Sequence, residues 1–557
     1  MGSYSYARFP YVTPPELRDG PGASRPVAVI GAGPVGLSAA IDLAGRGVPV
    51  VVLDDSDVVS VGSRAICWSK RSLEIFDRFG IGDRMVAKGV TWQVGRVFHG
   101  DRELYSFDLL PEGGHKMPAF INLQQYYVEQ YLVERAGDFP ALIDLRWKNE
   151  VVGLSSDGSG ATLEVATPEG PYRLRADWVI AADGARSPTR TRMGLPFTGP
   201  VFEERFLIAD IRTEADFPNE RLFWFEPTFH PGQSALLHKQ PDDVYRLDFQ
   251  LGPDADPEAE RRPERVIPRV RAVLGEGRPF ELEWCSVYAF RCARLERFVH
   301  GRVIFAGDSA HVVSPFGARG GNGGIQDVDN LAWKLALVIG GQAPASLLDT
   351  YDEERGHGAD ENIAASSRTT NFMTPKSAAE RRFRDGVLTL APDLPFARAL
   401  LNAGRLSQPC GLAGMSLQGP ADPAQAGVQP GVACPDAPVT DADGRAGWLL
   451  GRLGRGFTVL AFMRWEDPPD LSRLTWLAPD VRVVAVADRP FDLPGADMVV
   501  DTDGRAAERY GGAPGATFLI RPDQHVAARF DALDPDRVAA AFRVASGRAG
   551  APARVAA

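Results

Sequence analysis

The chain of 557 residues has little of what marks secreted, membrane-spanning or metal-binding proteins. Its five cysteines are odd in number and scattered, without a Cys-x-x-Cys pair or metal-ligand spacing, so the sequence predicts neither a disulfide framework nor a metal site. No run approaches the roughly 18 apolar residues of a membrane-spanning helix, and residues 1–25 have no apolar core of the signal-peptide type. We therefore expect a cytoplasmic protein that does not enter a membrane.

Positive charge is scarce relative to negative charge. The 61 lysines and arginines against 72 aspartates and glutamates leave a net charge of −11, and no basic stripe interleaved with aromatic residues is visible. This balance argues against nucleic acid as a partner. The length is enough for two or three domains with a sizeable buried core.

A glycine-rich motif lies near the start of the chain, between an apolar segment typical of a buried strand (26–30) and one typical of a helix (37–44). In this setting Gly31 permits a tight turn, Gly33 lets the backbone approach a pyrophosphate, and Gly36 allows close packing of the helix. The phosphates would face the positive end of the helix dipole. The arrangement is typical of a dinucleotide site.

An acidic residue strengthens this interpretation. Asp54 stands at the carboxyl end of a second expected parallel strand (48–53), 18 residues after Gly36. Dinucleotide sites place a carboxylate about 20 residues after the glycines, where it accepts hydrogen bonds from the adenosine ribose. We predict this role for Asp54.

Two further motifs follow in a fixed order. The first ends an expected strand with Asp183-Gly184 and continues to Ser187 and Arg190. The second runs from Ala306-Gly-Asp-Ser-Ala-His311 to Pro315-Phe-Gly and Gly320-Gly-Asn322. Together with the glycine motif, this order resembles that of the single-component FAD-dependent aromatic hydroxylases, the para-hydroxybenzoate hydroxylase superfamily. The similarity extends from about residue 26 to about residue 375.

The resemblance implies FAD held by three distant segments. Asp308 is expected to accept a hydrogen bond from a ribityl hydroxyl, and the glycines after it to offer backbone amides at the start of a helix over 325–339. Such amides favour the negative charge of reduced flavin. The alternative is that these glycines only cap a helix. The residues implied to bind the cofactor are Gly31, Gly33, Gly36, Asp54, Arg64, Gln125, Asp183, Asp308, Gly320, Gly321 and Asn322.

The cofactor-binding roles expected for Arg64 and Gln125 depend on the resemblance alone. Arg64 occupies the place of an arginine that contacts flavin in the family, and Gln125 begins a Gln-x-x-x-Glu-x-x-Leu pattern whose glutamine reaches the cofactor. Either residue could instead lie on the surface, and the neighbouring Gln124 leaves the register open. Ala318-Arg319 departs from the Gly-Gln that relatives often have.

The pattern of apolar residues changes between the second and third motifs. Segments over 205–212, 221–226, 233–240 and 244–251 carry apolar residues between turn signals, as strands of an antiparallel sheet do. The resemblance implies that this sheet covers the flavin ring and that an aromatic substrate lies between. Alternation places Ser234, Leu236 and His238 on one face, but does not decide which face looks at the flavin. The substrate-side candidates are Trp224, Ser234, Leu236 and His238.

The reaction implied by the family is the NADH- or NADPH-driven insertion of one oxygen atom from dioxygen into a phenolic ring, through a flavin C4a-hydroperoxide. Because a phenol is only about 0.1% ionised at pH 7, the site needs a base or a way to stabilise phenolate. His238 and Tyr245 are the candidate bases, and the Pro315 carbonyl is a candidate contact for substrate. His311 is expected to orient the Pro315 loop. Arg186 and Arg190 are candidate contacts for the phosphates of the nicotinamide cofactor.

Other activities share this scaffold. A Baeyer–Villiger or epoxidising monooxygenase is the nearest chemical alternative. A flavoprotein dehydrogenase that reduces a quinone without inserting oxygen is an alternative of a different class, and a catalytically silent flavin-binding protein is a third. A homodimer is compatible with all of them.

The expected fold class is α/β, with a Rossmann-like FAD-binding domain, an inserted, mainly antiparallel substrate sheet and a C-terminal thioredoxin-like domain. The last domain resembles that of the phenol hydroxylase and 3-(3-hydroxyphenyl)propionate hydroxylase branch, including an expected helix over 504–510 and a hairpin turning at Pro522-Asp523. Arg464 to Asp467 stand where thioredoxins carry cysteines, which excludes disulfide exchange. The expected boundaries are an N-terminal arm (1–25), the FAD domain (26–195 and 285–395), the substrate sheet (196–284), a linker (396–438) and the thioredoxin-like domain (439–545).

Overall fold

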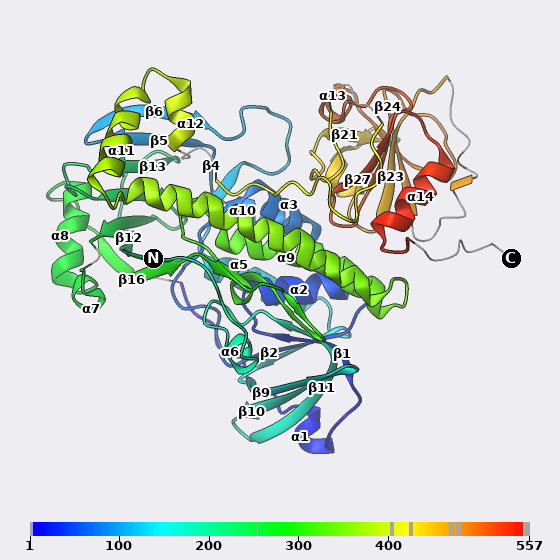
Figure 1. Ribbon diagram of the computed structural model, residues 1–557, viewed down its shortest axis with the longest axis horizontal. Coiled ribbons are helices and arrows are strands. Elements are labelled where there is room, and N and C mark those ends of the chain that lie inside the picture. Colours follow the sequence, from blue (N-terminus) through cyan, green and yellow to red (C-terminus); the bar gives the residue numbers. More distant parts are fainter. Residues whose placement is uncertain are drawn as a thin grey trace. The chain divides into compact units, whose positions relative to one another are not determined.

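The computed structural model describes residues 4–252, 254–401, 406–422, 427–466, 471, 473–474 and 481–549, with the backbone alone at 201, 203 and 290 (Figure 1). These residues form two compact units. The first unit contains 1–111, 118–328 and 359–408, and the second contains 112–117, 329–358 and 409–557. Asp467, the last residue of the segment Arg464 to Asp467 considered in the sequence, lies outside the described residues.

The glycine motif belongs to a sheet whose core strands run parallel, in the order β19, β11, β1, β2, β8. The expected strands of the glycine motif and of Asp54 are confirmed as β1 and β2, and the strand before Asp183 is confirmed as β11. Antiparallel strands extend this sheet. Its members are β1 (Arg25–Ile30), β2 (Val50–Asp54), β8 (Ile143–Trp147), β9 (Glu150–Asp157), β10 (Gly160–Thr167), β11 (Gly170–Ala181), β18 (Val299–His300) and β19 (Val303–Phe305).

The N-terminal arm packs on this unit. The Phe9 ring stacks on Trp147, with 4.5 Å between ring centroids, and the buried carboxylate of Glu16 accepts hydrogen bonds from Arg25 and Arg146. The other helices of the first unit are α2 (Pro34–Gly45), α3 (Lys70–Arg78), α4 (Gly82–Lys88), α5 (Gln125–Ala136), α6 (Pro188–Arg192), α11 (Ala378–Leu390) and α12 (Pro395–Leu401), after α1 (Pro15–Asp19). Two longer helices, α9 (Gly320–Ile339) and α10 (Asp349–Met373), have residues in both units.

Helix α9 begins five residues earlier than the sequence predicted. The expected helix over 325–339 left the glycines outside, whereas the structure includes them in the first turns. Side chains hold this start: Asn322 bonds to neighbouring backbone, and Asp327 accepts from the amide of Gly307 at 2.9 Å. Gly324 also allows close packing, because a Cβ there would lie 2.6 Å from a methyl carbon of Val35.

A second sheet of the first unit contains the four strands expected between the later motifs. Its order is β16, β12, β15, β14, β13, β5, β6. The sequence did not predict β5 and β6, which come from residues before the second motif, nor that β5 pairs with β13 in parallel. The strands are β5 (Val94–His99), β6 (Arg102–Asp108), β12 (Val201–Arg212), β13 (Arg221–Phe225), β14 (Ser234–Lys239), β15 (Val244–Leu251) and β16 (Glu281–Arg291).

The two faces of this second sheet pack against different parts. One face, carrying Leu237 and Phe249, packs on α8 (Pro263–Leu274) after the short helix α7 (Pro257–Glu260). The other face, carrying Phe223 and Leu236, contributes to a core with Phe316 and residues of α10 to α12. We call this second face the inner face. Smaller sheets are formed by β3 (Cys67–Ser69), β4 (Val90–Trp92) and β7 (Phe120–Asn122), and by β17 (Ala293–Arg294) and β20 (His311–Val312).

The second unit contains a mixed seven-stranded sheet. The expected hairpin and helix are confirmed, since β26 and β27 pair on either side of a turn containing Pro522 and Asp523 and α13 covers Arg505–Tyr510. The sheet order is β22 (Ala446–Trp448), β21 (Pro438–Asp441), β25 (Asp497–Val500), β24 (Val481–Ala487), β23 (Phe457–Phe462), β26 (Thr517–Ile520) and β27 (Val526–Phe530), and α14 (Pro535–Ala545) follows.

The segment expected as a linker is not free where the structure describes it. The amides of Gly419 and Gly431 donate to the carbonyls of Ala527 and Val526, and Cys434 is buried in the core of the second unit. Residues 402–405 and 423–426 of this segment lie outside the described residues.

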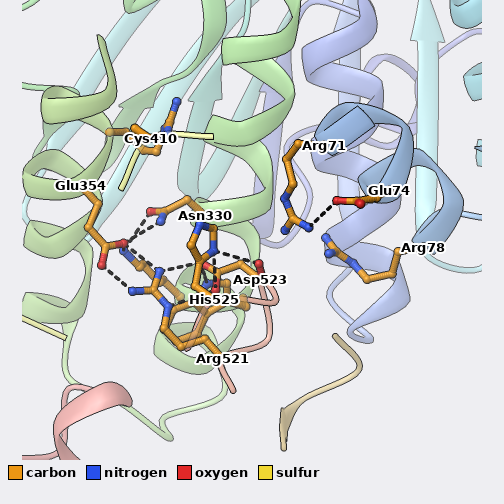
Figure 2. Close-up of polar contacts among 12 residues, drawn as sticks. Arg71, Glu74, Arg78, Asn330, Glu354, Cys410, Arg521, Asp523 and His525 are labelled. Carbon is orange, nitrogen blue, oxygen red and sulfur yellow. Dashed lines mark hydrogen bonds and ion pairs between the residues drawn. The ribbon is translucent and has the colours of Figure 1, made fainter. Parts of the chain in front are cut away.

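A fully buried ionic cluster connects the helical and sheet parts of the second unit (Figure 2). Arg521 binds both oxygens of Glu354, at 2.5 and 2.8 Å, and also binds Asp523. Lys334 and Asn330 donate to the same Glu354 carboxylate at 2.8 and 2.6 Å. Since Glu354 comes from α10 and Arg521 from the β26–β27 turn, these contacts fix the turn against the helix.

Candidate functional site

The glycine motif forms an open cradle between β1 and α2. Gly31 has a φ of +103°, and a Cβ there would lie 2.6 Å from the Ala182 carbonyl oxygen; a Cβ on Gly36 would lie 1.9 Å from the Gly31 oxygen. Beside Gly33 there is nothing within 4 Å, and no side chain caps the helix that begins after it. The backbone is therefore tightly packed on one side and open where a phosphate group would approach the helix start.

Asp54 lies at the edge of this cradle. Its carboxylate accepts hydrogen bonds from the amides of Ala32 at 2.6 Å and Ser56 at 2.9 Å, which leaves further acceptor positions for a ribose. Burial raises the pKa of Asp54 above its usual value. The carboxylate thus shapes the glycine loop as well as standing beside it.

The second motif has a mainly structural arrangement. Asp183 accepts from the Ser187 hydroxyl at 2.6 Å and the Thr189 amide at 2.9 Å, so its carboxylate holds its own loop. Arg190, expected as a phosphate contact, is buried and donates to the carbonyls of Ala185 and Ser309 at 2.7 and 2.8 Å. These bonds connect the second motif to the third.

The third motif presents an available carboxylate. Asp308 is exposed, and among the described residues none donates a hydrogen bond to it, although surrounding protein raises its pKa. Its neighbour His311 is buried, with Nε2 2.7 Å from the Asp327 carboxylate. Because Asp327 also binds the Gly307 amide, His311 positions the motif rather than reaching a ligand.

Asn322 connects the start of α9 to the strand that begins at Cys67. Its side-chain oxygen accepts from the amide and hydroxyl of Ser69, and its nitrogen donates to the carbonyls of Cys67 and Ala318. The buried side chain therefore has protein partners for its whole hydrogen-bonding capacity. Only the backbone of Asn322 is left to face a cofactor. Gly320 lies close to the Asp308 carboxylate, since a Cβ there would be 3.9 Å from it.

Arg64 and Gln125 belong to one loop-and-helix arrangement. Arg64 is exposed, and among the described residues its guanidinium has no hydrogen-bond partner. Gln125 accepts from the Ala65 amide and donates to Glu129, which in turn binds the amide and hydroxyl of Ser60. Gln125 thus positions the loop that presents Arg64.

The inner face of the second sheet meets this same loop. Arg246 forms a buried ion pair with Asp210 at 2.7 Å and donates to the backbone carbonyls of Ser63 and Arg64. The Phe316 ring of the third motif's loop packs on Phe206, with 4.8 Å between centroids. Contacts within the first unit therefore distinguish the two faces that alternation left open: the inner face is turned toward the Arg64 loop and the Phe316 loop of the third motif.

His238 and Cys67 lie between the inner face and the loop. The Cys67 thiol is 3.9 Å from His238 Nδ1 and 3.2 Å from the Asn122 side-chain oxygen. Burial raises the pKa of Cys67 to about 12 and lowers that of His238 well below its usual value. Both side chains are therefore neutral near pH 7, which excludes a thiolate–imidazolium nucleophile.

Asp248 is an inner-face residue that the sequence reasoning missed. It lies opposite Ile208 on β12 and Leu236 on β14, so its neighbours across the sheet are apolar. Burial raises its pKa to about 6, against the opposing effect of the Arg246 and Arg221 charges. Among the described residues Asp248 has no hydrogen-bond partner, so this carboxylate is available to a ligand.

The structure separates the expected substrate-side residues. Ser234, Leu236 and His238 share the inner face, whereas Trp224 and Tyr245 point to the α8 side. Trp224 stacks on Phe98 there, and the Tyr245 hydroxyl donates to the Ala215 carbonyl at 2.5 Å. The Pro315 ring is exposed and its carbonyl accepts from the Ala318 amide at 3.2 Å.

The described residues also bear on metal binding and membrane insertion. They contain no cluster of three potential metal ligands, and none of their helices has the length and hydropathy to cross a bilayer. A groove of about 610 Å³ on the second unit is lined by Asp441, Asp443, Arg452 and Asp497 among others. Arg452 and Asp497 pair with one another, and the groove has none of the convergent groups found on the inner face.

Comparison with known proteins identifies the cradle. The profile of a family described as FAD binding domain matches residues 24–366. A 3-(3-hydroxy-phenyl)propionate/3-hydroxycinnamic acid hydroxylase of Burkholderia vietnamiensis is 29% identical over 538 residues, covering 93% of this chain and 96% of its own length. An Escherichia coli K12 protein of the same activity is 29% identical over 528 residues, covering 92% and 93%.

Solved structures agree. The flavin-dependent monooxygenase PieE, in complex with FAD and substrate, matches with a TM-score of 0.76 at 23% identity, over 95% of this chain and 99% of that one, which supports the fold. The p-nitrophenol 4-monooxygenase PnpA of Pseudomonas putida matches with a TM-score of 0.61 at 28% identity, over 69% of this chain and 99% of that one.

The residues present fit FAD. The space beside Gly33 suits a pyrophosphate at the start of α2, Asp54 suits a ribose, and the exposed, unbonded Asp308 suits a ribityl hydroxyl. The chain belongs to this FAD-binding family and is an FAD-dependent monooxygenase of the aromatic hydroxylase group.

Proposed function

We propose that the protein hydroxylates a phenolic substrate at the expense of NADH or NADPH. The observation that carries this proposal is the inner face, which carries Asp248 and His238 and contacts the Arg64 loop and the Phe316 loop. FAD held at Gly33, Asp54 and Asp308 would supply the redox chemistry, in which electrons from the nicotinamide reduce dioxygen so that one oxygen atom enters the ring and the other becomes water. The names of the hydroxylases above, which act on phenolic acids, support a phenolic substrate.

The chain's own groups would bind and prepare the phenol. Of the two bases predicted from sequence, His238 lies on the inner face, while Tyr245 is turned away and engaged with a backbone carbonyl. Asp248 is a third candidate, since a pKa of about 6 makes it mostly ionised at pH 7 while keeping it a stronger base than an ordinary carboxylate. Phe206, Phe223 and Phe316 would keep water from the ring.

Isotope incorporation tests the proposed function. The FAD-loaded enzyme is supplied with NADH or NADPH, a panel of phenols and ¹⁸O₂. We expect a hydroxylated product that carries one ¹⁸O atom, with one nicotinamide oxidised per product. Oxidation of NAD(P)H that reduces a quinone without oxygen would instead favour the dehydrogenase. Formation of esters from ketones, or epoxides from alkenes, would favour the other monooxygenase types.

Replacement of Arg64 tests the cofactor assignment. Because its guanidinium is exposed and unbonded, we expect Arg64→Met to weaken FAD binding about 10- to 100-fold, the usual effect of losing a hydrogen bond to a charged group. The dissociation constant is measured by titrating the apoprotein with FAD. The matched control is Arg173→Met, because Arg173 is also an exposed arginine and lies on β11 in the part that pairs with β10. Equal affinity of Arg64→Met and the wild type would remove Arg64 from the cofactor site.

We also propose the domain roles stated from sequence, with residues 94–108 added to the substrate sheet at 196–284. The second unit is proposed to be thioredoxin-like, because two parallel strands at the centre of its sheet are followed by an antiparallel hairpin and a helix. The sequence has no cysteine after β23, where thioredoxins carry their cysteine pair. A structural or assembly role is therefore proposed in place of disulfide exchange.

A further inference from the structure

A buried arginine on the inner face has a ring contact but, among the described residues, no hydrogen-bond or ion-pair partner. Arg221 begins β13 and is 7% exposed, and burial lowers its pKa. Its guanidinium lies 5.6 Å from the centroid of the Phe223 ring, a contact that leaves its N–H donors without a hydrogen-bond acceptor or carboxylate in the part of the chain that the structure describes. A buried guanidinium with five unmatched donors is costly, so such a group is usually matched by an anion.

The surroundings of Arg221 offer donors and aromatic surface. Its strand neighbour on β5 is Gly95, and the Phe107 ring lies over this glycine, 2.2 Å from where a Cβ would be. Tyr105, two residues along β6, has a buried hydroxyl that forms no hydrogen bond with any described residue. Because burial raises the pKa of Tyr105, this hydroxyl remains a donor. Arg221 and Tyr105 lie within electrostatic range of one another.

The charges on the inner face are matched unequally. Arg246 is neutralised by its ion pair with Asp210. Asp248 influences Arg221 electrostatically but forms no ion pair with it, so both charges remain open to the space between them. Cys67 and His238, which lie nearby, are neutral. The Arg221 end of the face therefore favours an anionic group and the Asp248 end a hydrogen-bond donor.

We propose that Arg221 and Tyr105 form a subsite for the carboxylate of the substrate, which is a phenol carrying an acidic group. This inference rests on the proposed function and adds the class of substrate. The planar guanidinium fork binds a carboxylate through two parallel hydrogen bonds, and the Tyr105 hydroxyl supplies a third. The phenolic hydroxyl would then lie toward Asp248.

Binding of two matched probes tests the subsite without turnover. The FAD-loaded enzyme is titrated, in the absence of NAD(P)H, with 3-hydroxyphenylacetate and with 3-ethylphenol, which has a similar shape but no charge. Binding is followed by the change in flavin absorbance and by the shift in melting temperature. We expect the acid to bind at least tenfold more tightly. Equal binding of the two probes, or failure of the acid to bind, would overturn the proposal.

Variants identify the residues responsible. We expect Arg221→Met to lose the preference for the acid, with a 10- to 100-fold weaker affinity, and Tyr105→Phe to lose about fivefold, while 3-ethylphenol binds as before. Arg96→Met is the matched control, because Arg96 lies opposite Leu222 on the next strand and pairs with Glu220. An unchanged preference in Arg221→Met would contradict the subsite.

Stability of the substrate-free enzyme separates ligand binding from a structural role. If Arg221 binds the substrate's anionic group and has no such partner in the substrate-free enzyme, Arg221→Met should melt at the same or a higher temperature than the wild type, because a buried unmatched charge is removed. A marked fall would indicate a protein partner instead. Selective binding of the acid without any ¹⁸O incorporation would leave the subsite standing and reject the proposed function.

Discussion

Glu354→Gln is expected to destabilise the second unit by about 3–5 kcal/mol, the usual cost of removing one charge from a buried ion pair. The glutamate accepts hydrogen bonds from Arg521, Lys334 and Asn330 inside a cluster with no exposed surface (Figure 2). Glutamine keeps the shape but leaves two buried cations opposite a single remaining carboxylate, Asp523. Thermal and urea unfolding, followed by a probe of the second unit, measure the loss.

The pH dependence of stability provides a second measurement. The nearby cations lower the pKa of Glu354 to about 2 from an ordinary value of 4.5. The stabilisation is therefore fully present above about pH 4.5 and is lost as the pH falls toward 2. The variant should lack this part of the acid denaturation curve. Glu353→Gln is the matched control, since the neighbouring Glu353 is exposed and, within the described part of the chain, binds only the Ser416 amide; an equal loss in both variants would contradict the assignment.

Local sequence patterns predicted the strands and helix around the glycine motif. Where the structure differs from the prediction, contacts between residues distant in the sequence account for the difference. The strand, glycine turn and helix around Gly31 follow from periodicity and from the positive φ that glycine tolerates. The start of α9 could not be predicted from local pattern, because glycine has low helix propensity. The hydrogen bonds of Asn322 and Asp327 to distant segments determine where this helix begins. Strand β5 was missed because its partner β13 lies more than 100 residues further along the chain.

Contacts between distant parts of the sequence also determine features of the candidate site that local patterns could not predict. The sequence places His238 on an alternating face, but only contacts in the folded chain, those of Arg246 with the Ser63–Arg64 backbone and of Phe206 with Phe316, show which loops that face meets. Tyr245 lies one residue from Arg246 and therefore faces the other way. Asp248 follows Arg246 by two, so two charges on alternate positions of an expected strand were a signal available from the sequence alone.

Asp248→Asn is expected to reduce kcat/KM for a phenolic substrate about 10²- to 10⁴-fold near pH 7.5, the usual contribution of a general base. The wild-type rate should fall as the pH drops below about 6, because burial sets the pKa of Asp248 there and the protonated carboxyl cannot accept the phenol's proton. The variant should lack this dependence. Rates measured from pH 5 to 9 check both expectations, and a variant that retains the acid limb would exclude Asp248 as the base.

Two comparisons separate a base from a group that only maintains the fold. Because the folded-state pKa of Asp248 lies above its unfolded value, the ionised carboxylate destabilises the fold as the pH rises from 4 to 6, by about 3 kcal/mol. Asp248→Asn should therefore raise the melting temperature at pH 8 more than at pH 4. The control Asp243→Asn, at an exposed residue just before the same strand, should change neither rate nor stability.

The second comparison uses a more acidic substrate. A nitrophenol, which ionises more readily than phenol, should restore much of the rate that Asp248→Asn loses, since it needs less help in giving up its proton. A defect of the same size with both substrates would assign Asp248 to binding or packing instead.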